Sequence, residues 1–144
     1  MNGFLGTSAS LWSDLSLVLT WVLLIVASFG AIQAHRRRFS THCPVMAVAA
    51  FLNWIPVLVV MIPQWIGVAT GAETLVTGAL ASAPLLHGVL GAVTQLLMTY
   101  TVTRMYWVER LPPKKPIWLM RATLTLWSLT IIGGTVVYIV GYAV

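Results

Sequence analysis

Charge is scarce in this sequence. Only 8% of the 144 residues are charged, and three of them are acidic, while 59% of the residues are hydrophobic. A soluble domain carries about 25% charged residues, so this chain has too few charges to cover a water-facing surface. We therefore expect lipid to cover much of the surface, and we predict an integral membrane protein.

Cysteine is nearly absent, and no recognisable catalytic motif is present. The single cysteine, Cys43, excludes a disulfide within the chain. No nucleophile–base pair, carboxylate pair or phosphate-binding loop is visible, so we predict that the protein is not an enzyme. The basic residues form no patch interleaved with aromatic residues, which argues against nucleic-acid binding.

Four long hydrophobic runs dominate the chain. At 1.5 Å per residue, about twenty helical residues span the roughly 30 Å of bilayer hydrocarbon. We predict an all-α fold, in which residues 1–144 form one domain, an antiparallel bundle of four transmembrane helices. The first run has no preceding Lys or Arg and is followed by three arginines, so we interpret it as a retained helix. The predicted spans are about residues 15–34, 45–66, 85–103 and 118–140.

Positive charge marks two junctions between the predicted spans. The eight Lys and Arg residues lie at or near the first-to-second and third-to-fourth junctions. The positive-inside rule places these junctions in the cytoplasm and both termini outside. We therefore expect a multi-pass protein of the cell inner (cytoplasmic) membrane. The residues expected to contact anionic lipid head groups are Arg36, Arg37, Arg38, Lys114, Lys115 and Arg121.

Three prolines occur in or beside the second predicted span. Pro44 fits the first turn of that helix, where its missing N–H costs nothing. Pro56 and Pro63 lie inside the span and remove hydrogen bonds to carbonyls one turn earlier. We expect each of these two prolines to bend the helix.

Several polar residues fall within the predicted spans. His87 and Asp14 lie at similar depth near the outer side, and a hydrogen bond between them would clamp two helices together. A ligand to haem, a pigment or a metal, and a proton relay, are the alternatives for His87. Asn53 and Gln95 both fall near mid-membrane, where we expect them to form an amide pair.

A second group of polar and sulfur-bearing residues lies near the inner surface. His35, His42, Cys43 and Met46 cluster there, and sulfur and imidazole ligands suit copper or zinc. His42 and Cys43 are the candidate metal ligands, but their spacing matches no standard zinc signature. The favoured interpretation therefore places both histidines with the arginines, in a cationic rim facing lipid head groups. His42 and His87 begin successive antiparallel spans, so they are about 25 Å apart and one haem iron does not bridge them.

Three stretches of the chain together resemble one known family. The combination is similar to the small four-helix bacterial and archaeal membrane proteins called domain of unknown function 420. For some members this resemblance implies a link to the maturation of haem-copper respiratory oxidases. The stretches are Arg36–His42 before a span with Asn53; Leu86–Gly91 with Gln95 and Tyr100; and Trp118–Arg121 before Trp127 and Tyr138.

Three functions are compatible with these features. The favoured one is a non-catalytic accessory subunit of a respiratory, photosynthetic or monooxygenase membrane complex, with other integral membrane subunits as its partners. The alternative is a haem- or copper-binding protein that acts in the maturation of haem-copper oxidases through His87 or the His42–Cys43 pair. The third is an oligomeric transporter, which is disfavoured because charged groups lie only near the helix ends.

Overall fold

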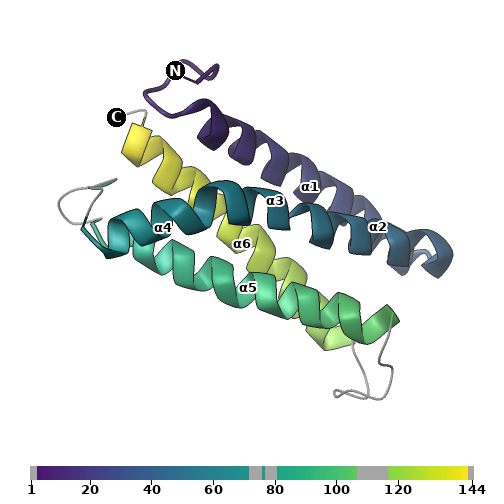
Figure 1. The fold of residues 1–144 in the computed structure, drawn as a ribbon. Coiled ribbons are helices and arrows are strands. Elements are labelled where there is room, and N and C mark those ends of the chain that lie inside the picture. The colour runs from purple at the N-terminus through teal and green to yellow at the C-terminus, as the bar shows by residue number, and fades with distance from the viewer. Residues whose placement is uncertain (1–2, 72–75, 77–80, 107–116, 143–144) are drawn as a thin grey trace.

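The computed structural model describes residues 3–71, 76, 81–106 and 117–142 of the chain. Within these residues the regular elements are all helices, as predicted (Figure 1). Four helical stretches are long and apolar enough to cross a membrane. They are α1 (Leu11–His35), a composite second stretch (Phe39–Ala69), α5 (Ala83–Tyr106) and α6 (Ile117–Tyr142).

Each predicted span lies inside one of these four stretches, so the four-helix membrane architecture is confirmed. The helices run past the predicted ends because hydrogen bonding continues into the polar flanks, where hydropathy no longer marks the span. Lys114 and Lys115, which were predicted to contact lipid head groups, lie outside the described residues. Arg121 lies on the first turns of α6 and is exposed.

A three-residue turn joins the first two membrane helices. Arg37 adopts a left-handed backbone conformation, with φ +59°. Its N–H donates to the Ala34 carbonyl at 3.0 Å, and the Arg38 N–H donates to the Gln33 carbonyl at 2.9 Å. These bonds satisfy carbonyls that the end of α1 would otherwise leave unpaired. The chain thus reverses at once, and the side chains of Arg36 to Arg38 are all exposed.

The expected position of Pro44 in the first turn of the second helix is wrong. α2 spans Phe39–Leu52, so Pro44 lies inside it. The reason is the tightness of the preceding turn, which lets the helix start at Phe39 rather than after the proline. Pro44 therefore removes the hydrogen bond to the carbonyl of Ser40, an exposed residue near the start of the helix.

The second stretch changes its hydrogen-bonding pattern halfway along. Asn53 interrupts the α-helix, and a π-helical segment follows Pro56 directly; Pro63 lies in the first turn of the helix after it. In Figure 1 the ribbon bends around this region, in agreement with the bend expected from the two prolines. The elements after α2 are α3 (Trp54–Pro56), η1 (Val57–Met61) and α4 (Ile62–Ala69).

The bundle places both ends of the described chain on one side. α1 packs against α2, and α5 packs against α6; α1 also contacts α6, and α2 contacts α5. The Ser8 N–H donates to the Tyr142 carbonyl at 3.2 Å. Figure 1 shows the N and C ends together, opposite the turn between α1 and α2. The central core consists of Leu23, Ala27, Ala49, Ala50, Met98, Val102, Trp127 and Ile131.

Candidate functional site

A large cavity occupies the half of the bundle nearer the two termini. Its volume is about 640 Å³, inside the range of about 300–1,000 Å³ that small-molecule sites occupy. Residues from α1, the composite second stretch, α5 and α6 line it. The aromatic and polar residues of its lining are Ser13, Ser16, Thr20, Asn53, Trp54, Gln64, Trp65, His87, Thr94, Gln95, Trp127, Thr130, Tyr138 and Tyr142.

Glycines make room for the aromatic side chains at this cavity. A Cβ at Gly88 would overlap the indole of Trp65, so only glycine lets α5 approach α4 here. A Cβ at Gly134 would lie 2.8 Å from Cε1 and 3.1 Å from Nε2 of His87. The imidazole therefore packs against the bare backbone of α6, which fixes its position at the cavity wall.

The predicted hydrogen bond between Asp14 and His87 is wrong. Asp14 is fully buried and accepts hydrogen bonds from the Tyr138 hydroxyl and, at 2.8 Å, from the Leu5 N–H. The residues before α1 fold back over the end of that helix, and a Cβ at Gly3 would overlap the carboxylate. The carboxylate is thus satisfied by the N-terminal segment and α6, a contact that spacing along α1 and α5 does not indicate.

His87 consequently has no hydrogen-bond partner within the part of the chain that the structure describes. An imidazole has one donor and one acceptor nitrogen when neutral. The half-buried ring of His87 lines the cavity. Its two nitrogens are the hydrogen-bonding groups that a bound molecule would meet there.

The predicted amide pair at mid-membrane is present. Asn53 Nδ2 donates to Gln95 Oε1 at 2.7 Å, and both side chains are buried at the cavity. The pair leaves Asn53 Oδ1 and Gln95 Nε2 without partners among the described residues. One buried acceptor and one buried donor therefore stay unsatisfied at this pair, which costs stability unless a further molecule bonds to them.

Substitution of these amides tests the pairing. We expect Asn53→Leu to lower the free energy of unfolding by about 0.6–1.7 kcal/mol, because it removes an interhelical hydrogen bond in a membrane bundle. Combining it with Gln95→Leu is expected to recover much of this loss, since removing both amides leaves neither one unpaired. Denaturant titration of the unaltered protein, the two single variants and the double variant in detergent micelles measures the coupling free energy between the two amides. Strictly additive losses would contradict the pairing.

The structure separates His42 from the exposed residues at the α1–α2 turn. His35 and the three arginines are exposed there, but His42 is buried and its Nδ1 lies 2.8 Å from the Gly30 carbonyl oxygen. The placement of His42 in the cationic rim is therefore wrong. The cause is the early start of α2, which turns this side chain toward α1. Cys43 is half-buried and is not in a disulfide.

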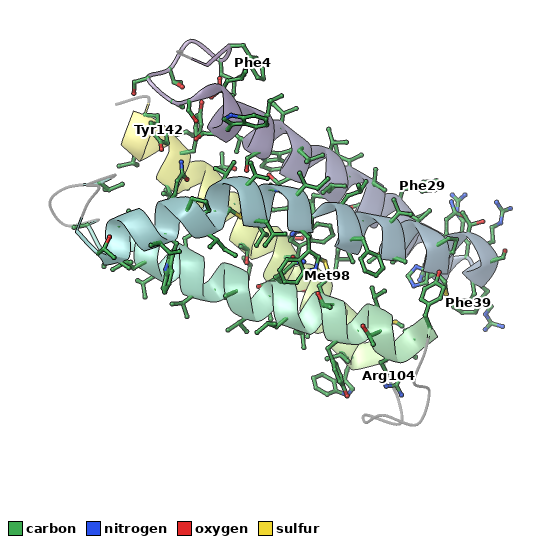
Figure 2. All side chains as sticks on the ribbon, in the orientation of Figure 1. Phe4, Phe29, Phe39, Met98, Arg104 and Tyr142 are labelled. Carbon is green, nitrogen blue, oxygen red and sulfur yellow. The ribbon has the colours of Figure 1, made fainter. Side chains whose placement is uncertain are left out.

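A second, small cavity of about 60 Å³ adjoins His42 and Cys43. Four of the five described methionines line it, from α2, α5 and α6, and Figure 2 shows one of them, Met98, in the middle of the bundle. Trp127 is the one described residue that lines both cavities. The residues around the small cavity are His42, Cys43, Met46, Met98, Thr101, Val102, Met105, Tyr106, Met120, Thr123, Leu124 and Trp127.

No protein-family model, curated protein or solved structure matches this chain. The resemblance to domain of unknown function 420 therefore stays a prediction. Within the described residues, no group of three or more His, Cys, Asp or Glu side chains is placed to hold a metal ion. The two cavities and the side chains around them are thus the features that bear on function.

Proposed function

We propose that this protein is a non-catalytic membrane subunit that holds a neutral, flat, lipid-soluble ligand of the quinone class in the large cavity. The observation that carries the proposal is the lining of that cavity. Three indoles, and an imidazole that has no hydrogen-bond partner among the described residues, surround about 640 Å³ of mostly apolar space. A quinone has an apolar ring and two carbonyl groups, which match this combination of surfaces.

The cavity is accessible from the side that lipid covers. Several of its lining residues on α4 and α5 are also exposed on the outside of the bundle, so the wall is thin between these two helices. A ligand with an isoprenoid or alkyl tail would leave that tail among the lipid chains. The exposed lining residues include Ile62, Ile66, Val89, Val93 and Leu96.

The charge of the lining favours a neutral ligand over an ionic one. Among the described residues that line the large cavity there is no Asp, Glu, Lys or Arg. An anion buried there would lack a counter-charge, and the cost of desolvating it would be large. A haem carries two propionates that need cationic or well-solvated partners. A quinone carbonyl, in contrast, carries no charge, so in the same cavity it needs only hydrogen-bond donors.

The polar groups of the cavity supply those donors. His87 can donate from one ring nitrogen, and Gln95 Nε2 carries hydrogens that no described residue accepts. Trp54 Nε1 already donates to Thr99 Oγ1 at 3.2 Å, and Trp65 Nε1 donates to the Leu85 carbonyl at 3.4 Å. The indoles are therefore held in place by their N–H groups and present ring surface to a flat ligand.

The subunit role and the membrane orientation belong to the same proposal. A bound quinone couples electron carriers within a membrane, which fits an accessory subunit of a respiratory, photosynthetic or oxygenase complex, with other integral membrane subunits as partners. The exposed arginines between α1 and α2 lie opposite the two termini. By the positive-inside rule this arrangement supports a cytoplasmic turn and extracytoplasmic termini in the cell inner membrane.

Quinone titration tests the proposal. The whole chain is placed in lipid nanodiscs and titrated with a short-tailed benzoquinone or naphthoquinone, and tryptophan fluorescence is recorded. We expect saturable quenching, because three of the indoles line the cavity. Replacing His87 with leucine removes one hydrogen bond of about 1 kcal/mol and is expected to weaken binding about fivefold. His35→Leu is the matched control, since His35 is exposed at the opposite end of the bundle.

A variant that fills the cavity gives a second test. A Cβ at Gly91 meets only Thr130 Cγ2, at 3.7 Å, so the backbone accepts a side chain there. Gly91→Leu is expected to abolish saturable quenching. Quenching that is linear in quinone concentration for the unaltered protein would overturn the proposal. A haem absorption band in the protein purified from its own membrane, lost in His87→Leu, would replace the quinone by haem.

A further inference from the structure

We propose that the small cavity beside Trp127 is a binding site for copper in the Cu(I) state. The described residues that line this cavity of about 60 Å³ include the one cysteine of the chain, a histidine and four methionines. This inference is independent of the quinone proposal, because the residues of the two cavities differ except for Trp127. Thioether, thiolate and imidazole are the ligands that Cu(I) prefers over oxygen donors.

The sulfur-bearing residues that line this cavity come from three different helices. Met98 and Met105 of α5 are one heptad apart and thus share a face of that helix. Met46 lies one turn after Cys43 and His42 on α2, and Met120 lies in the first turns of α6. Their convergence on one cavity follows from the antiparallel packing of these helices, so it is visible only in three dimensions.

One ring nitrogen of His42 is bound to the backbone, which leaves the other nitrogen available to a metal. A backbone carbonyl only accepts, so the 2.8 Å contact with Gly30 places the proton of the imidazole on Nδ1. The lone pair of the neutral ring is then on Nε2. Metal-binding histidines are commonly held in this way, by a hydrogen bond from the second ring nitrogen to a carbonyl. The bond fixes both the tautomer and the direction of the ring.

The charge balance of the site favours a monovalent metal. The cysteine thiol binds Cu(I) as thiolate and releases its proton to the aqueous side, so one positive charge replaces another. The methionines and the histidine add no charge. Cu(I) and its ligands are then neutral together, whereas Zn²⁺ or Cu²⁺ would add a net positive charge near the buried guanidinium of Arg104, which contacts Met105 of the same cavity.

Arg104 forms a hydrogen bond with one of the four methionines. Its Nη1 donates to Met105 Sδ at 3.7 Å, so this sulfur is already engaged by a cation. We therefore assign the metal to Cys43, His42, Met98 and Met120, with Met46 at the edge of the cavity toward Gly30. Methionines also serve as flexible core packing, and replacing sulfur at nearly constant shape distinguishes the two roles.

Anaerobic titration of the purified full-length protein with Cu(I), against a chromogenic Cu(I) chelator, tests this site. We expect one copper ion per chain, with sulfur ligands in its X-ray absorption spectrum. Met98→Leu combined with Met120→Leu is expected to lower the affinity at least about tenfold, since even indirect disturbance of metal ligands costs 10–100-fold. Leucine is close to methionine in volume, so the fold is retained. Met61→Leu, which alters the large cavity instead, is the matched control.

Three results would overturn the copper site. Equal affinity of the unaltered protein and the double variant would show that the methionines only fill space. Copper that stays bound at full affinity in Cys43→Ser would be bound elsewhere. An absorption spectrum with only nitrogen and oxygen ligands would place the metal on exposed groups such as His35. Circular dichroism and gel filtration of each variant establish that a loss of binding is not a loss of fold.

Discussion

Replacing Asp14 with alanine is expected to destabilise the protein more than replacing any other single polar residue discussed above. The carboxylate is fully buried and holds together three parts of the chain. It accepts from the hydroxyl of Tyr138 on α6 and from the N–H of Leu5 before α1. Alanine removes the acceptor of the Leu5 N–H and leaves the Tyr138 hydroxyl with only its 2.7 Å contact to Thr7 Oγ1, and each lost partner carries its own penalty.

Comparison with Tyr138→Phe shows how much of the stability lost in Asp14→Ala comes from the hydrogen bond to Tyr138. Phenylalanine removes the hydrogen bond to the charged acceptor, which is worth about 1.5–3 kcal/mol, and the part-buried contact of the hydroxyl with Thr7 Oγ1. The carboxylate keeps its bond to Leu5, so the loss should be smaller than for Asp14→Ala. Unfolding by denaturant in mixed micelles, with circular dichroism as the readout, gives both midpoints. If Asp14→Ala unfolded at the same midpoint as the unaltered protein, the carboxylate would not anchor the N-terminal segment.

Trp127→Ala is expected to lower the free energy of unfolding by about 3–5 kcal/mol. Only 2% of this side chain is exposed, and it belongs to the central core with Met98 and Ile131. Lipid supplies no hydrophobic driving force between helices, so the loss is mainly one of packing contacts. The indole also lines both cavities. Its removal alters the walls of both and should weaken quinone quenching and Cu(I) binding together.

Trp118 supplies the matched control for Trp127. It lies near the start of α6 and is 61% exposed. Because its ring faces lipid rather than other helices, Trp118→Ala is expected to change the free energy of unfolding by no more than about 0.5 kcal/mol. Equal losses for the two variants would contradict the burial of Trp127 in the central core.

The membrane helices were predictable because hydropathy reports directly on the surrounding lipid. The amide pair of Asn53 and Gln95 was predictable for a related reason, since polar groups at the same depth in a bilayer have few other partners. The helix ends were less accurate. Pro44 indicated a start that the three-residue turn through Arg37 overrides, because capping bonds rather than hydropathy decide where α2 begins.

The arrangement around the cavities was only partly predictable. Asp14 is satisfied by Tyr138 and by backbone that precedes its own helix, and helical spacing does not report on such a fold-back. The sulfur-rich site was indicated only by its α2 residues. The spacing of Met98 and Met105 on one face of α5 was a usable signal, but the position of Met120 beside them depends on the register between α5 and α6.

Extraction of the protein from its own membrane into polymer-bounded lipid discs, followed by mass spectrometry of the bound lipids, tests the proposed function most directly. We predict a neutral quinone-type molecule that is retained through purification, and that is lost from Gly91→Leu discs prepared in the same way. Discs that carry no quinone above the level of the surrounding membrane, or that carry the same amount with and without Gly91→Leu, would contradict the proposal.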